Sequence, residues 1–170
     1  TAPPPLRYPD PATLSEVQTI FTNAVRTTQD KTRLSAIDST GRLLGYILRT
    51  SPQSDNVSGY RGPSECLVGL APDGRTVTTV RVRRSYDTDA YVDQIRRAEA
   101  FWKRFVGRSV EEFTSFEFPK EKVEGVSGAT QTAQAVAEGA KRRLSAEAKG
   151  RSAKEQWRPQ SRDWALAAII

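Results

Sequence analysis

A run of small and hydroxylated residues from Glu124 to Thr132 is the segment whose residue types and spacing best suit chemistry. It precedes an apolar pattern of helical spacing, and the first N–H groups of a helix lack partners within the helix. Together with the positive end of the helix dipole, they form a natural anion site. Gly128 allows close backbone approach, and the hydroxyls of Ser127, Thr130 and Thr132 can reach a phosphate. Two readings stay open: a phosphate cradle, or an ordinary helix start capped by Ser127 or Thr130.

The composition excludes several kinds of site. The chain has no histidine, no methionine and one cysteine, Cys66. The chain alone therefore cannot supply a histidine general base, a His-ligated zinc, a haem with His/Met ligands or a cysteine-ligated cluster. Cys66 cannot form an internal disulfide, and its apolar surroundings predict a small buried hydrophobe.

The net charge of +6 and the pI of about 9.7 raise the question of an anionic partner. The basic residues are spread over three stretches: Arg81, Arg83 and Arg84; Arg96, Arg97, Lys103 and Arg104; Lys141, Arg142 and Arg143. Neither an aromatic-interleaved RNA signature nor zinc-finger spacing accompanies them. We therefore expect solvated basic faces and no nucleic-acid partner, with a basic module that binds nucleic acid or anionic lipid as the alternative.

Three segments have apolar residues at helical spacing. The first has Thr13 as N-cap and Glu16 in a capping box, and is expected to end near Thr27. The second is amphipathic, has Gly107 as its stop, and carries Tyr91, Ile95, Ala98, Trp102 and Phe105. Its aromatic residues Trp102 and Phe105 are expected in the core. The third follows Thr130, with an apolar stripe of Ala133, Val136, Ala137, Ala140 and Leu144.

Two hairpins are predicted between the first two helices. Residues 33–38 pair with 43–50, and residues 65–70 pair with 76–83. Residues 51–64 are rich in Ser, Pro, Gly, Asp and Asn and are expected to form a loop. Residues 108–126 are a connection with a possible strand. Consecutive hairpins with segregated helices predict an α+β fold, in which helices pack on an antiparallel sheet.

The run Ser127-Gly128-Ala129-Thr130, followed one residue later by Thr132, resembles the flavinylation motif of FMN-binding domains. Such domains occur in the flavin subunits of sodium-translocating NADH:quinone reductase and of Rnf complexes, and in membrane-bound NosR-type proteins. In that family a flavin transferase uses FAD to attach FMN, through its phosphate, to the threonine of the motif. The resemblance implies that Thr130 is the attachment residue, that Ser127, Gly128 and Ala129 lie at the phosphate, and that Thr132 is a further hydroxyl donor.

The loop Gly59-Tyr60-Arg61-Gly62-Pro63 resembles a glycine–tyrosine–x–glycine–proline loop of NosR-like members. By this resemblance Gly59 and Tyr60 pass beside the flavin. The alternative for Tyr60 is a loop aromatic that packs on the sheet.

The stretch Asp87-Thr88-Asp89-Ala90-Tyr91-Val92 resembles the Asp-Thr-Pro-x-Tyr-Val stretch of the same branch. It extends the resemblance to roughly residues 14–145 and favours the NosR-like branch. By this resemblance Asp87 and Thr88 bond the polar edge of the flavin; simple N-capping of the following helix is the alternative.

Two positions depart from the family pattern. Glu124 stands where the motif usually opens with Asp, and Asp89 stands where proline is usual. Because of Glu124, a sensory or structural extracytoplasmic domain without a covalent cofactor remains an alternative interpretation.

The resemblance implies an electron-transfer domain that carries covalent FMN and is not itself an enzyme. Its expected partners are a flavin transferase and redox partner proteins or membrane subunits. We expect a linker at residues 1–11, the FMN-binding domain at 12–147 and a basic tail at 148–170. The apolar residues 164–170 are either the opening of a membrane-spanning helix, which needs about 20 residues, or a packed C-terminal helix. The expected location is the periplasmic or extracytoplasmic face, with a membrane anchor in the full-length protein.

Overall fold

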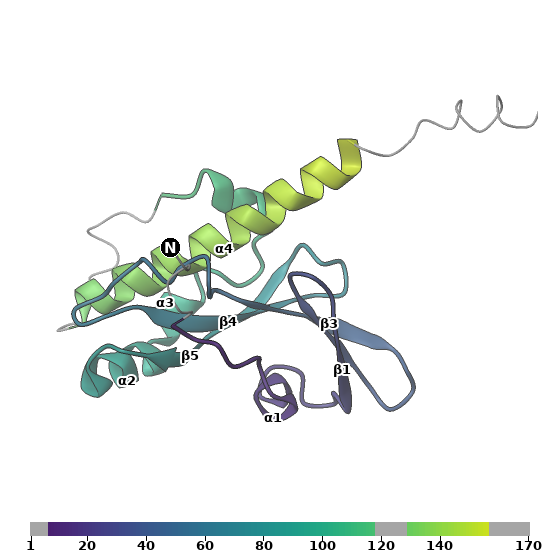
Figure 1. The fold of residues 1–170 in the computed structure, drawn as a ribbon, viewed down its shortest axis with the longest axis horizontal. Helices are drawn as coiled ribbons and strands as arrows, with labels where there is room; N and C mark the ends of the chain where they lie inside the picture. The colour runs from purple at the N-terminus through teal and green to yellow at the C-terminus, as the bar shows by residue number, and fades with distance from the viewer. Residues whose placement is uncertain (1–6, 118–128, 157–170) are drawn as a thin grey trace, which may run out of the picture.

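A five-stranded antiparallel sheet is the centre of the computed structural model (Figure 1), which describes residues 7–117 and 129–156. The strands lie in chain order across the sheet: β1 (Arg26–Gln29), β2 (Leu34–Ile37), β3 (Leu43–Arg49), β4 (Ser64–Leu70) and β5 (Val77–Ser85). The helices are α1 (Leu14–Gln18), α2 (Asp89–Arg97), α3 (Glu99–Trp102), the 3-10 helix η1 (Glu111–Thr114) and α4 (Thr130–Gln156). The predicted α+β class, with a sheet built of hairpins, is confirmed.

The turns of the two predicted hairpins have the same construction. In each, an aspartate accepts hydrogen bonds from backbone N–H groups further along the turn, Asp38 in one and Asp73 in the other. Each also has a glycine in the left-handed region, Gly41 with φ 85° and Gly74 with φ 65°. Glycine adopts this region without steric cost, which explains why the chain reverses at these points.

The sheet separates two hydrophobic cores, because successive side chains of a strand point to opposite faces. In β4, Cys66, Val68 and Leu70 belong to the core shared with α4, whereas Leu67 belongs to the core shared with α1. Figure 1 shows α4 across one face of the sheet and α1 against the other. Every residue of β4 is buried, as expected for a strand covered on both faces.

The predicted stripe of α4 is confirmed, since all five of its members are buried: Ala133, Val136, Ala137, Ala140 and Leu144. The helix continues to Gln156 and is anchored on its way by Arg143, which is 2% exposed. Its guanidinium donates to the carbonyl oxygens of Arg49 at 3.0 Å and Thr32 at 2.6 Å. Burial lowers the pKa of Arg143, and the ion pair with Glu147 opposes this effect.

The first helix is shorter than the prediction. Its capping box is present, but α1 ends at Gln18, and the residues near Thr27 form strand β1. The apolar spacing that suggested a longer helix belongs to a turn, whose Phe21 packs into the second core. Phe21 lies over Gly45, where a Cβ would collide with its ring. The β-branched pair Thr27 and Thr28 then suits the pairing with β2.

The second predicted helix is broken at Ala98, whose φ of −80° and ψ of 74° are not helical. The break separates α2 from α3. The carbonyl of Ile95 accepts from the N–H of Ala98 at 3.0 Å and from the Trp102 indole at 2.8 Å, which holds the two short helices together. Gly107, with φ 81°, ends the segment as expected, and Phe105 is fully buried.

From Arg108 to Glu117, the connection after Gly107 forms η1 and an isolated bridge between Thr76 and Ser109, and no regular strand occurs among these residues. Its residues 118–126 lie outside the described residues. In the described ranges, no helix combines the length and the apolar character needed to cross a membrane. The apolar residues 164–170 are not among those described.

A buried ion network fixes the sheet to the N-terminal segment. Glu65 of β4 has no exposed side-chain surface and pairs with Arg83 of β5 at 3.0 Å and with Arg49 of β3. Arg83 also pairs with Glu16 of α1 and donates to the carbonyl of Asp10. Burial acts to lower the pKa of Arg83, but its bonds to Glu16 and Glu65 outweigh this and leave the pKa raised.

Glu65→Gln should lower the free energy of unfolding by about 3 kcal/mol, because it leaves the buried Arg83 with one carboxylate fewer. Urea unfolding at neutral pH measures this loss. Glu138→Gln is the control, since its pair with Arg142 is 45% exposed on both sides and should contribute less than about 0.5 kcal/mol. Equal losses in the two variants would contradict the assignment.

Candidate functional site

The loop before β4 is shaped by close backbone approaches. The N–H of Gly59 donates to the carbonyl of Gly62 at 2.9 Å, so the loop closes on itself. A Cβ at Gly59 would collide with a carboxylate oxygen of Asp87 and lie 3.2 Å from the Cα of Thr132. A side chain at Gly62 would meet the Cβ of Tyr86 at 2.6 Å. Glycine at these positions allows the loop to lie directly against the segment after β5.

Asp87 is the centre of the hydrogen bonds in this region. Its carboxylate accepts the N–H groups of Tyr60 at 2.9 Å, Arg61 at 3.1 Å and Thr88 at 2.9 Å. It also accepts the hydroxyl of Thr132 from the first turn of α4. Asp87 is 5% exposed, so these four donors replace its hydration.

The carboxylate of Asp87 is ionised at neutral pH. Burial acts to raise its pKa, because a charge is disfavoured away from water. The hydrogen bonds from Thr132, Tyr60, Thr88 and Arg61 outweigh burial and hold the pKa below its usual value. The site thus contains a fixed negative charge whose bonds are directed to protein groups.

Thr130 is the first residue of α4, and its side chain is half-buried. The N–H of Ala133 donates to the carbonyl of Ala129 at 2.9 Å, which is the first helical bond. The N–H groups of Thr130, Gln131 and Thr132 therefore have no acceptor within the helix. They are the groups that would meet an anion at this end of α4.

A hollow of about 250 Å³ lies where the loop and α4 meet. Its lining consists of Tyr60, Tyr91, Ala129, Thr130, Gln131 and Thr132. Tyr60 is 60% exposed, and its ring meets the ring of Tyr91 edge-on at a centroid distance of 5.8 Å. The wall of the hollow thus offers an aromatic surface opposite a helix N-terminus.

The structure brings together the predicted site residues that it describes. Ala129, Thr130, Thr132 and Tyr60 line the hollow, and Gly59 lies against Asp87 and Thr132. Thr88 occupies the N-cap position of α2, although its side chain makes no capping bond. Ser127 and Gly128, like Glu124, lie outside the described residues.

Two details of the site were not predicted. The hydroxyl of Thr132 is bonded to Asp87, so its predicted role as a phosphate donor stays untested while its structural role is clear. Tyr91 also lines the hollow, whereas the helical pattern placed it only on an apolar face. Tyr91 lies in the first turn of α2, three residues after the N-cap Thr88. Its place in the stretch that resembles Asp-Thr-Pro-x-Tyr-Val is the sequence signal that could have identified it.

The single cysteine of the chain, Cys66, is not among the residues that line the hollow. Cys66 is buried in β4, and burial raises the pKa of its thiol to about 12. It remains protonated at neutral pH, as expected for a small core residue. No cluster of potential metal ligands occurs among residues 7–117 and 129–156.

Comparison with known families identifies the class of this chain. A family model described as FMN-binding domain matches residues 59–145, just over half of the 170 residues. The chain belongs to the FMN-binding domain family. The match begins at Gly59 and contains Asp87 and Thr130, so the whole hollow lies within it. Neither a curated protein nor a solved structure matches the chain.

The residues present fit part of an FMN molecule. The N–H groups that open α4 and the Thr130 hydroxyl suit a phosphate, and Tyr60 and Tyr91 suit an aromatic ring or a ribityl chain. The hollow is smaller than the roughly 300–1,000 Å³ typical of pockets that enclose a ligand. These residues would therefore hold one portion of FMN and leave the rest outside the hollow.

Stability should depend on the charge of Asp87. Because its folded pKa is depressed, its contribution is present above the unfolded value of about 4 and is lost as the pH falls through the folded pKa. Asp87→Asn should be less stable than the parent at pH 7, and the difference should shrink below about pH 4.

Urea unfolding of both chains between pH 7 and pH 3 measures this difference. Asp93→Asn is the control, because Asp93 is 52% exposed and forms a surface pair. Its loss of stability at pH 7 should be smaller than that of Asp87→Asn, because exposed pairs contribute little. A gap for Asp87→Asn that stays constant over the whole pH range would contradict the account.

Proposed function

We propose that this chain is an electron-transfer domain that carries FMN attached through its phosphate to the hydroxyl of Thr130. The observation that supports this most is the position of Thr130, which opens α4 and lines the hollow within the family match. A hydroxyl that is half-buried at a helix N-terminus is accessible to a reagent and close to N–H groups that can hold a phosphate.

In the proposed attachment, the Thr130 oxygen forms a bond to the FMN phosphorus of FAD. The bond from that phosphorus to the AMP portion breaks, AMP leaves, and the hydroxyl proton passes to solvent or to the transferase. No oxidant is needed, because the step is a phosphoryl transfer. The N–H groups of Thr130, Gln131 and Thr132 would hold the phosphate oxygens, with Ser127, Gly128 and Ala129 beside them.

Asp87 and Thr132 act in this proposal as positioning residues. Their hydrogen bond joins α4 to the loop at Tyr60, so it sets the distance between the attachment residue and the aromatic wall. The predicted contacts of Asp87 and Thr88 with the polar flavin edge stay proposals. The negative charge of Asp87 lies close to the site and would favour an oxidised over an anionic reduced flavin.

When bound, FMN supplies the redox chemistry, and the protein supplies position and electrostatics. The chain has no histidine that could serve as an acid or base, and we propose relay of electrons in place of substrate turnover. The partners in this proposal are a flavin transferase and redox proteins or membrane subunits. The proposed location is the extracytoplasmic face, where a covalent bond prevents loss of the cofactor.

Co-production with a flavin transferase should add the mass of one FMN less one water to the peptide that contains Thr130. Thr130→Val should abolish the added mass, because it removes the nucleophilic oxygen, and Thr130→Ser should retain it. Intact-mass and peptide mass spectrometry measure both. A second domain known to be flavinylated by that transferase shows that the enzyme is active. No addition under those conditions, or addition at another residue, would refute the covalent assignment.

A further inference from the structure

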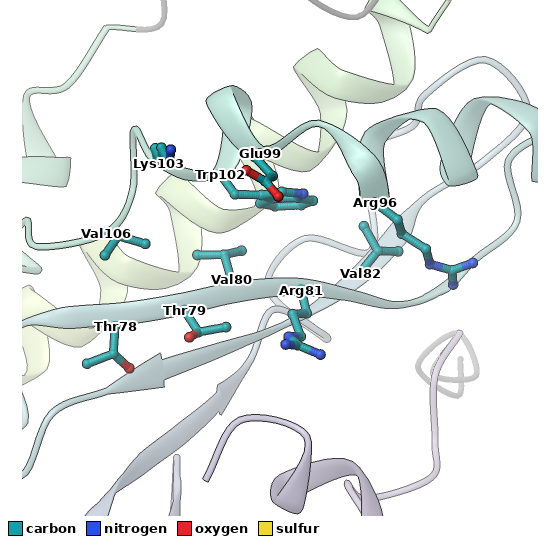
Figure 2. A pocket seen from close by; sticks show the side chains of 10 residues that line it. All are labelled: Thr78, Thr79, Val80, Arg81, Val82, Arg96, Glu99, Trp102, Lys103 and Val106. Atoms are coloured by element: carbon teal, nitrogen blue, oxygen red, sulfur yellow. The ribbon is translucent and has the colours of Figure 1, made fainter. Parts of the chain in front are cut away.

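A second and larger hollow, of about 570 Å³, lies between β5 and the helices α2 and α3 (Figure 2). It shares no lining residue with the hollow at Thr130. Five consecutive residues of β5, Thr78 to Val82, line it. Thr79 to Val82 pair in regular register with β4, and successive side chains of a regular strand point to opposite faces. Residues of both faces line the hollow because the edge of the strand faces it.

This edge of β5 is paired over part of its length. The N–H of Val77 donates to the carbonyl of Arg108 at 2.9 Å, and the N–H of Gly107 donates to the carbonyl of Val77 at 2.8 Å. Beyond this point, from Thr78 to Val82, no described residue other than those of β4 bonds to the backbone of β5. The unpaired N–H and C=O groups of an edge strand are a template for a further strand.

The side of the hollow next to the helices is apolar. Figure 2 shows Val80 and Val82 on the side of β5 that faces α2 and α3, where Trp102 and Val106 also lie. Val106 is 47% exposed and Trp102 is only partly buried, whereas Val80 and Val82 are 3% and 9% exposed. Trp102 and Val106 therefore supply most of the accessible apolar surface. An added strand could place every second side chain against this surface.

The rim of the hollow is basic. It has three cations, Arg81, Arg96 and Lys103, against one carboxylate, Glu99. Arg81 points to the face of β5 opposite Val80 and Val82 (Figure 2). Within the described part of the chain Arg81 and Lys103 have no ion-pair partner, and Arg96 has only an exposed pair with Asp93. The excess of positive charge favours an acidic occupant.

We propose that an extended acidic segment of a partner protein binds here by adding a strand to the edge of β5. Its backbone pairs with residues 78–82, and alternate apolar side chains lie against Trp102 and Val106. Its carboxylates on the other face meet Arg81, and those at the ends of the hollow meet Arg96 and Lys103. The binding is independent of flavin, because the two hollows are separate.

The probe is a capped octapeptide of alternating glutamate and valine, titrated into the 170-residue chain and followed by fluorescence anisotropy and by amide chemical shifts. We expect a dissociation constant below about 1 mM, which rises with the salt concentration. We also expect amide chemical-shift changes centred on residues 78–82. A peptide with four glutamates followed by four valines should bind at least about tenfold more weakly, because it cannot match the two faces of a strand. A backbone N-methylated version should also lose binding, because strand addition needs its N–H groups.

Arg81→Glu and Lys103→Glu should each weaken the binding of the alternating peptide about tenfold, because each reverses a charge at the rim. Arg26→Glu is the matched control, since Arg26 is an exposed cation on β1 at the other edge of the sheet. Thermal unfolding shows that each variant is folded. No binding at 1 mM peptide, equal affinity for the alternating and block peptides, or an equal loss in Arg26→Glu would overturn the proposal.

Discussion

The hydrogen bonds to the buried carboxylate of Asp87 are the constraint on which the site depends. They join the loop at Tyr60 and Arg61 to the first turn of α4 at Thr132, segments 26 to 45 residues away in the sequence. A buried carboxylate is tolerated only when its lone pairs are satisfied, so the loop and the helix must meet at this point. The hollow beside Thr130 is a consequence of that meeting.

The rest of the fold supplies a rigid frame for this contact. α4 is held over one face of the sheet by small residues and by Arg143. The Arg143 guanidinium donates to the carbonyl of Arg49 at the end of β3 and to that of Thr32 in the turn between β1 and β2. Asp87 lies two residues after the end of β5, and β5 is fixed by the ion network of Glu65 and Arg83. Arg49 takes part in both anchors, since its carbonyl accepts from Arg143 and its guanidinium pairs with Glu65. Both α4 and β5 are thus fixed to the sheet, and together they present Thr130 and the aromatic wall to each other.

Local patterns predicted most of the elements, and long-range contacts explain the differences. Asp38 and Asp73 with their turn glycines identify both hairpins, and the alanine-rich stripe identifies α4. The predicted length of α1 was wrong, because Ile20 and Phe21 pack into the second core from a turn. Helical spacing alone cannot distinguish such a turn from a longer helix. The motif at Thr130 was visible in the sequence, whereas the bond between Thr132 and Asp87 was not, since nothing local relates these two residues.

The role of Asp87 in holding the attachment site can be tested through its partner Thr132. Thr132→Ser keeps the hydroxyl that bonds to Asp87, and Thr132→Val keeps the shape without it. The direct measurement is the fraction of each folded variant that gains one FMN by intact mass, after co-production with an active flavin transferase. The account predicts that the serine variant is modified like the parent and that the valine variant loses most of its flavin. Equal modification of the two variants would contradict it.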